Sequence, residues 1–272
     1  MPVTLLVLTL FAVFPVTIST PEVQTPDGPA AVWLVEVPLE RVTARTVAAD
    51  PRDPDGPGVF QTRLWPVQRI AKREGAWLAV NGDFFSAPPV SVLGRQERWV
   101  HGNRARVVGW GLTDGELWGE PLPQDGERVT LWLSGDRATI GTDRPAWAEQ
   151  AVSGSTRLLT AGRTVAPDSP TRHPRTTAGL SGDGRTLYLL IADGRRPGHS
   201  VGLTLAEAAT LLKHAGATDA LNLDGGGSTT LVAARRLLNR PSDGGTFTPP
   251  LSIPRPVANA LLLSPRPPLK GR

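Results

Sequence analysis

Short apolar segments, separated by turns rich in Gly, Pro and Asp, run through most of this sequence. Residues 31–37 alternate apolar and polar positions, as half-buried strands do, whereas residues 187–192 are almost wholly apolar, which is typical of a central strand. The clearest helical spacing lies at residues 204–214, where Thr204 and Glu207 form a capping-box pattern. Many strands, few helices and no regular strand–helix alternation predict an α+β fold, with a single domain rich in mixed β-sheet.

The chain opens on an apolar run. Residues 5–18 carry no charged side chain, but a membrane-spanning helix needs about 20 such residues. A run of this length is typical of a secretory signal, with small polar residues Ser19 and Thr20 near a plausible cleavage point. Residues 1–4 lack the Lys or Arg that usually precedes such a run, and a buried N-terminal strand is the alternative.

This pattern predicts the organisation of the chain and its location. We expect residues 1–20 to be a signal peptide or a hydrophobic N-terminal segment, and residues 21–272 to be the functional domain, with its core at about 30–264. No other stretch approaches the length of a membrane span. The processed domain is therefore expected outside the cytoplasm, either secreted or periplasmic, without a stable membrane span.

Composition narrows the function classes. The chain has no Cys, which excludes disulfides, thiolate zinc sites, iron–sulfur clusters and a cysteine nucleophile. The formal net charge is only +4 and no basic stripe alternates with aromatic residues, so a nucleic-acid partner is not expected. Only three of the 29 basic residues are Lys. The excess of Arg reflects either a GC-rich gene or the binding of planar anions by guanidinium groups.

The strongest local motif is LNLDGGGSTTL at residues 221–231, in which an apolar strand leads to Asp224 and a turn without side chains. Backbone N–H groups of such a turn can approach an anion closely. A tight hairpin needs one or two glycines rather than three, which favours a functional loop. The motif lacks the Gly-Lys-Ser/Thr of a P-loop, and no helical pattern follows as in a dinucleotide-binding fingerprint. The candidate loop residues are Gly225, Gly226, Gly227 and Ser228.

Other polar residues also stand next to strands. Each of these motifs has a simpler interpretation when taken alone, such as an Asn-Gly or Asp-Gly turn or a solvated Arg. An Arg in such a place can also bind a phosphate or carboxylate through two parallel hydrogen bonds. The candidates are Asn81, Asp83, His173, Arg175, Asp193, Arg195, Asn239, Asp243, Arg255 and Asn259.

The order of the motifs resembles that of the phosphodiester glycosidase family. The matching segments are NGDFF from residue 81, HPRTT from 173, ADGR from 192, ALNLDGGGST from 220, NRPSD from 239 and RPVANALL from 255. The resemblance covers about residues 77–263. Asp83 stands where the family frequently has Gly, and Thr177 where it frequently has Ala; neither change disturbs the match.

The resemblance implies hydrolysis of a sugar-1-phosphodiester to free sugar and a phosphomonoester, in cell-envelope or exopolysaccharide metabolism. The leaving phosphate is a weak base, so it needs charge stabilisation, which we assign to Arg175, Arg195 and Arg255. A carboxylate must act at C1, and Asp224 is the first candidate and Asp193 the second. The residues then expected to bind sugar or phosphate oxygens are Asn81, Asp83, His173, Asn239, Gly225, Gly226, Gly227 and Ser228.

The alternative class is an exported, non-catalytic domain that binds a glycan or phosphoglycan. Carboxylates at Asp193 and Asp224 favour the enzyme, because a carboxylate repels a phosphate that is only to be bound. The expected partner is a carbohydrate phosphate, and the oligomeric state stays open. No cofactor is expected, since no metal-ligand spacing occurs; a Ca²⁺ or Mg²⁺ ion shared by the carboxylates and the phosphate is the open alternative.

Overall fold

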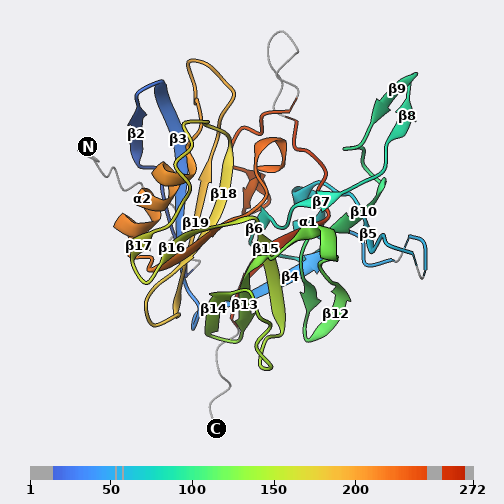
Figure 1. The fold of residues 1–272 in the computed structure, drawn as a ribbon, viewed down its shortest axis with the longest axis horizontal. Coiled ribbons are helices and arrows are strands. Elements are labelled where there is room, and N and C mark those ends of the chain that lie inside the picture. Colours follow the sequence, from blue (N-terminus) through green and yellow to red (C-terminus); the bar gives the residue numbers. More distant parts are fainter. Residues whose placement is uncertain (1–14, 53, 57, 244–252, 267–272) are drawn as a thin grey trace.

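A large antiparallel sheet forms one half of the molecule (Figure 1). The computed structural model describes residues 15–52, 54–56, 58–243 and 253–266. In spatial order, the strands of this sheet are β1 (Thr17–Ser19), β3 (Gly28–Pro38), β19 (Thr186–Ala192), β18 (Arg175–Leu180), β20 (Asp219–Asn222), β16 (Thr156–Thr160) and β17 (Arg163–Thr164), with β2 (Glu22–Thr25) also paired to β3.

Two five-stranded sheets and two small ones make up the rest of the described strands. The second sheet contains β22 (Arg236–Leu237), β21 (Leu231–Ala233), β6 (Leu78–Asn81), β23 (Asn259–Pro265) and β4 (Val42–Ala48). The third contains β12 (Glu116–Gly119), β11 (Gly111–Thr113), β15 (Gln150–Gly154), β13 (Val129–Ser134) and β14 (Arg137–Gly141). The small ones are β5 (Thr62–Arg63), β10 (Arg104–Val107) and β7 (Phe85–Ser86), and the hairpin of β8 (Val90–Val92) and β9 (Arg95–Glu97), which projects from the body in Figure 1.

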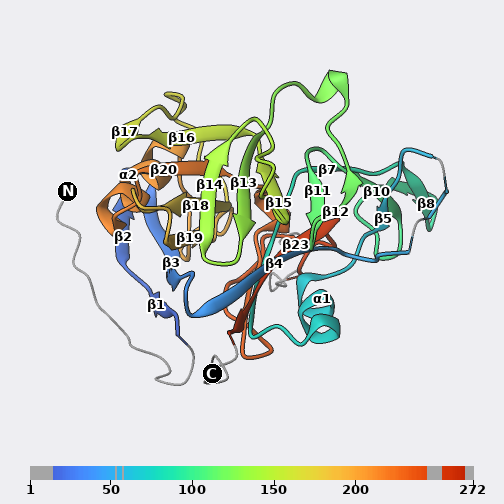
Figure 2. The same cartoon turned by 90° about the horizontal axis from the view of Figure 1, so that it is seen from below.

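Two α-helices cover the outer faces of the two main sheets. Helix α2 (Leu205–Ala215) packs on the large sheet through Ala208, Ala209 and Leu212, and α1 (Val67–Glu74) packs on the second sheet. Figure 2 shows the two helices on opposite sides of the molecule. The eight-stranded sheet and the two five-stranded sheets share a central core, made mainly of Val, Leu and Ile side chains from all three. The α+β prediction is thus confirmed.

The local patterns of the sequence form as expected where they depend on neighbouring residues. In α2, the Thr204 hydroxyl accepts a hydrogen bond from the Glu207 amide, and the Glu207 carboxylate accepts one from the Thr204 amide. The apolar segment 187–192 lies inside the large sheet, between β3 and β18. Alternating side chains of these strands therefore face the central core and the α2 layer.

The first described residues belong to the large sheet. Strand β1 pairs Thr17–Ser19 with residues 34–36 of β3, and Val16 and Ile18 are 8% and 9% exposed within the central core. The expected hydrophobic segment up to residue 14 lies outside the described residues. Cleavage near Ser19 or Thr20 would remove this strand. None of the helices described here is long and apolar enough to cross a membrane.

Removing β1 should destabilise the domain. A chain that starts at Thr20 loses the burial of Val16 and Ile18, each worth about 1.5–3 kcal/mol, whereas a chain that starts at Pro15 retains both. We expect urea unfolding to show a lower midpoint for the shorter chain at an unchanged slope. Equal midpoints for the two chains would contradict a structural role for β1.

Candidate active site

Strand β20 delivers Asp224 to the place where the two main sheets meet. The Leu223 amide donates to the Thr176 carbonyl of the large sheet at 2.9 Å, and the Asp224 amide donates to the Gly82 carbonyl beyond β6 at 3.2 Å. The Asp224 side chain is 9% exposed, and its Oδ1 accepts a hydrogen bond from the Gly225 amide at 2.8 Å. One carboxylate oxygen is thereby oriented by the loop that follows.

The three glycines after Asp224 leave room for three different neighbours. A Cβ on the first glycine of residues 225–227 would lie 2.7 Å from the Pro174 carbonyl oxygen, and one on the second 3.1 Å from the Arg195 guanidinium. A Cβ on the third would overlap the Asp243 carboxylate. Any side chain in the loop would therefore displace a group that surrounds Asp224.

The backbone of this loop is less available to an anion than the sequence suggests. The Gly225 amide is engaged by the Asp224 carboxylate, and the Gly226 amide donates to the Pro174 carbonyl at 2.9 Å. The Ser228 amide donates to the Gly225 carbonyl at 3.1 Å within a turn of 3₁₀-helix, η2 (Gly226–Ser228). The glycines serve the close approach of side chains more than the direct capture of an anion.

Positive charge gathers on the Gly226 side of the loop. Arg195 is exposed, and its guanidinium lies 3.4 Å from Nδ1 of His173. Arg175 donates from Nε to the Leu203 carbonyl at 3.0 Å, and its pKa is lowered by burial and by the charge of Arg195. Burial and the two Arg charges also lower the pKa of His173. Within the described ranges, no carboxylate forms an ion pair with either Arg, so this side is suited to an anion.

The Gly227 side of the loop is different, because its cation is already paired. Arg255 donates to both carboxylate oxygens of Asp243, at 3.0 and 3.2 Å. The guanidinium also lies 5.2 Å from the ring centroid of Trp99, and Phe85 packs on that indole in an edge-to-face arrangement. Trp99 is 38% exposed. The phosphate-binding role expected for Arg255 is thus opposed by its bidentate ion pair.

Two charged groups on the Gly227 side influence the pKa of the Asp224 carboxyl. Burial raises the pKa of Asp224 to about 6, while Arg255 lowers this pKa and Asp243 raises it. The Ser228 hydroxyl also lowers this pKa, although its geometry falls short of a good hydrogen bond. Asp224 therefore changes charge near neutral pH.

Asp83 is a second buried carboxyl, and the charge of Asp224 affects its pKa. Its Oδ1 accepts hydrogen bonds from Nδ2 of Asn259 at 2.8 Å and from the Ser153 amide at 3.1 Å, while Oδ2 is buried without a partner. Burial, reinforced by the charge of Asp224, raises the pKa of Asp83 to about 7. Oδ2 would also contact a Cβ at Gly109, so a glycine is needed there. The sugar-hydroxyl role expected for Asp83 has little support, because its side chain is 1% exposed.

The side chain of Asn81 forms hydrogen bonds only with other parts of the described protein. Its Nδ2 donates to the Asp224 carbonyl at 2.6 Å, and its Oδ1 accepts from the Thr176 hydroxyl at 2.8 Å and from the Thr230 amide at 3.1 Å. The residue is fully buried. This arrangement favours a positioning role over the substrate contact that the sequence suggests.

Asp193 and Asn239 form a separate buried cluster. The Asp193 carboxylate accepts hydrogen bonds from Nε2 of His199 at 2.9 Å, from Nδ2 of Asn239 at 3.0 Å and from the Arg240 amide at 3.0 Å. Asn239 also accepts from the Leu231 amide at 2.7 Å. Since Asp193 is 1% exposed and both its oxygens are engaged, the geometry favours a role in holding the loop that carries Arg195.

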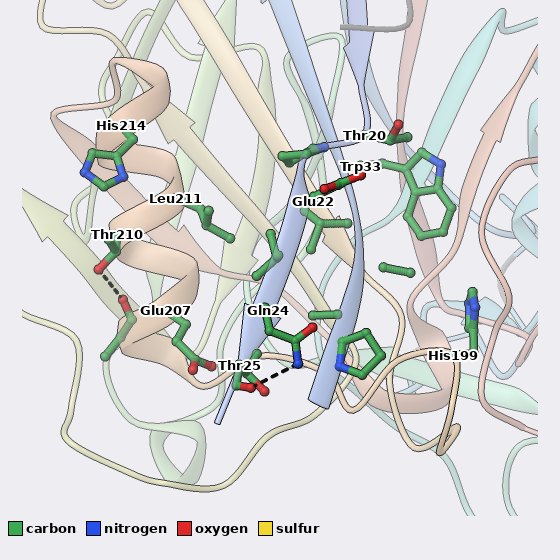
Figure 3. A pocket seen from close by; sticks show the side chains of 17 residues that line it. Thr20, Glu22, Gln24, Thr25, Trp33, His199, Glu207, Thr210, Leu211 and His214 are labelled. Atoms are coloured by element: carbon green, nitrogen blue, oxygen red, sulfur yellow. Dashed lines mark hydrogen bonds between the residues drawn. The ribbon is translucent and has the colours of Figure 1, made fainter. Parts of the chain in front are cut away.

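A hollow of about 960 Å³ lies apart from Asp224, between α2 and the strands β2 and β3. Figure 3 shows Glu207, Thr210 and His214 on the helix side, Glu22 and Gln24 on the strand side, and His199 at one end. None of the residues around Asp224 described above lines it. Its link with the site is indirect, through the hydrogen bond from His199 to Asp193.

Two features of the site go beyond the residues expected from sequence. Asp243 and Asn259 stand out in the sequence as polar residues beside strands, but only the fold shows that they contact Arg255 and Asp83. Trp99 carries no local signal, because its contacts with Phe85 and Arg255 are long-range. Among the described residues, no group of three or more His, Cys, Asp or Glu side chains is arranged to hold a metal ion.

The raised pKa of Asp83 should make folding stability depend on pH. The folded chain retains a proton on Asp83 up to about pH 7, whereas an unfolded carboxyl loses it near 3.8. Stability should therefore fall as pH rises from about 4 to 7, and then level off. Asp83→Asn should reduce the loss between pH 5 and pH 8 by about 2–3 kcal/mol, since one pKa unit is worth about 1.4 kcal/mol.

Urea unfolding at pH 5 and pH 8 measures this effect. Glu116→Gln, which removes an exposed carboxylate of a hairpin, is the control and should leave the pH dependence unchanged. An Asp83→Asn protein that loses as much stability as the wild type over this interval would show that Asp83 is ionised throughout.

Comparison with known proteins places these features in a family. A family model described as phosphodiester glycosidase matches residues 74–264. The chain is 30% identical over 210 residues to N-acetylglucosamine-1-phosphodiester alpha-N-acetylglucosaminidase of Bos taurus, and 29% identical over 210 residues to the human protein of that name. In both cases the alignment covers 70% of this chain and 38% of the relative, so the chain spans well under half the length of these relatives.

Solved structures share the fold. The catalytic domain of the zebrafish enzyme of the same name, auto-inhibited by its pro-peptide, superposes with a TM-score of 0.67 at 21% identity, covering 98% of this chain and 89% of that one. A candidate exported protein of Burkholderia pseudomallei superposes with a TM-score of 0.58 at 19% identity, covering 87% and 74%. With the family model matching more than half of its residues, this chain belongs to the phosphodiester glycosidase family, whose members are hydrolases.

Proposed function

We propose that this chain hydrolyses sugar-1-phosphodiesters, releasing free sugar and a phosphomonoester. The observation that carries the proposal is the combination, on one glycine loop, of a buried carboxylate with a guanidinium that no carboxylate neutralises among the described residues. The sugar-phosphate chemistry is supported by the names of the relatives.

Asp224 is the group that acts at C1 of the sugar. In its ionised form it either attacks C1, forming a glycosyl ester that water then hydrolyses to free sugar, or removes a proton from the water that attacks C1. The bond between C1 and the phosphate oxygen then breaks, and its electron pair leaves with the phosphomonoester. Oδ1 is fixed by the Gly225 amide, which leaves Oδ2 as the reacting oxygen. The anomeric configuration of the released sugar distinguishes the two roles.

Arg195, with Arg175 and His173 beside it, receives the leaving phosphate. The departing group gains negative charge, and preformed cations lower the barrier without having to transfer a proton. Arg175 is held in place by the Leu203 carbonyl, while the exposed Arg195 lies beside Gly226 and His173 and is free to follow the developing charge. With its pKa raised to about 7, Asp83 is mostly protonated near pH 6 and adds little negative charge to the surroundings of Asp224 at this step.

We also propose that the domain works outside the cytoplasm, in cell-envelope or exopolysaccharide metabolism. The support is the apolar run at residues 5–18 and the likeness to a candidate exported protein. Because Val16 and Ile18 are buried in the core, processing would have to occur before residue 16 to leave β1 in place. Mass spectrometry of the mature N-terminus tests both points: an unprocessed chain that stays in the cytoplasm would contradict the location, and a chain starting after Ser19 would contradict cleavage before residue 16.

Substitutions at the two key residues should separate the chemical roles. Asp224→Asn should lower kcat on an N-acetylglucosamine-1-phosphodiester by about 10³-fold or more, as expected for loss of a group acting at C1. Arg195→Gln should lower kcat/KM on the phosphodiester by about 10²-fold, in the range for loss of one charge-stabilising donor. The same variant should have little effect on a 4-nitrophenyl glycoside, which has no phosphate.

The control for Arg195 is Arg185→Gln, which breaks an exposed ion pair with Asp136 in a distant hairpin. Release of sugar is measured against a panel of sugars and alcohols. A wild-type protein that binds these compounds without releasing sugar would favour the non-catalytic binding domain, and full activity of Asp224→Asn would exclude Asp224 from the chemistry.

The pH profile should report the ionisation of Asp224. If its carboxylate is the reactive form, kcat/KM rises as pH increases through about 6. Arg255→Gln removes a charge that lowers this pKa, so the acidic limb should move to higher pH by roughly 0.5 unit or more. Asp243→Asn should move the limb in the opposite direction. A limb that stays in place in both variants would assign it to another group.

A further inference from the structure

The two sides of the Asp224 loop differ in the charge that they offer a ligand. On the Gly226 side, Arg195 lies against the loop with His173 and Arg175 nearby, and no carboxylate of the described chain pairs with either Arg. A ligand on this side therefore meets uncompensated positive charge, which favours a phosphate.

On the Gly227 side, the charges cancel and an aromatic surface is exposed. The Arg255 and Asp243 side chains form a bidentate pair directly against the loop. Beyond Arg255 stands Trp99, which is 38% exposed although Phe85 and Arg255 pack on it. An exposed indole next to a carboxylate and a guanidinium suits a ligand that has both apolar C–H faces and hydroxyl groups.

Both sides are adjacent to the reacting carboxyl. Arg255 and Asp243 shift the pKa of Asp224, and Gly226 and Gly227 follow it by two and three residues. A sugar on the Gly227 side would thus present C1 to Asp224 with its leaving phosphate directed towards Arg195. The reverse orientation would place the phosphate beside an Arg255 whose charge Asp243 already neutralises, and would leave the Arg195 charge without an anion.

On the basis of the function proposed above, we propose that the substrate binds with a fixed polarity: the sugar packs on Trp99 and donates a hydroxyl hydrogen bond to Asp243, and the phosphate lies at Arg195 and Arg175. Trp99 is then the residue that determines affinity for the sugar. Arg255 orients Asp243 and takes no part in holding the phosphate. The alcohol group on the far side of the phosphate extends away from Trp99.

Binding of the two halves of the substrate tests this polarity without requiring turnover. Ligand-observed NMR titrations give separate dissociation constants for N-acetylglucosamine and for methyl phosphate. Trp99→Ala should raise the Kd of the sugar at least fivefold and leave that of methyl phosphate within twofold. Arg195→Gln should have the opposite effect. Asp243→Asn should weaken binding of the sugar, and Trp99→Phe should preserve most of it.

The control is Trp147→Ala, which removes a half-buried indole that, like the more exposed Trp99, has an Arg over its ring, here Arg137 at 4.1 Å. It should change neither constant, and thermal unfolding verifies that each variant is folded. The polarity is overturned if Trp99→Ala weakens methyl phosphate instead of the sugar, or if it changes neither. A wild type that binds both compounds but releases no sugar from any phosphodiester would overturn the proposed hydrolysis and leave the polarity standing.

Discussion

The geometry of the site depends on the hydrogen bonds made by the buried side-chain amide of Asn81. It lies at the end of β6 in the second sheet, and its hydrogen bonds reach the Asp224 carbonyl, the Thr176 hydroxyl of the large sheet and the Thr230 amide. A fully buried amide that lost these partners would leave polar groups unsatisfied at a cost of about 1–3 kcal/mol each. The two sheets are therefore joined by hydrogen bonds at the residue that positions the backbone of Asp224.

The same packing produces the electrostatics of the site. Asp224 and Asp83 lie between sheets, where burial disfavours the charged form of a carboxyl. It raises the pKa of Asp224 to about 6 and that of Asp83 to about 7. Arg255 and Asp243 act on Asp224 in opposite directions. A carboxyl with its pKa near neutrality is suited to acid–base or nucleophilic work, because it is ionised at working pH without being strongly stabilised as an anion.

Sequence reasoning succeeds where the signal is local and fails where it depends on distant partners. The capping box of α2, the α+β class and the glycine loop follow from residues close in the chain. For Asp193, a candidate for the chemistry, and Asn239, a candidate for substrate binding, the sequence could not show that their polar atoms bond to each other and to backbone groups. Trp99 could not be singled out at all, because its meaning comes from Arg255, far along the chain.

Arg195 is exposed and pairs with no carboxylate of the described chain, although Asp193 stands only two residues before it. Arg195 adopts a φ of 58°, in the left-handed region that non-glycine residues rarely occupy, and its guanidinium packs against Gly226. Asp193 beside it is held by His199, Asn239 and the Arg240 amide. Such backbone strain persists only where the surroundings enforce it. Because these donors occupy the Asp193 carboxylate, it forms no ion pair with Arg195, and the phosphate proposed for this side would meet an uncompensated charge.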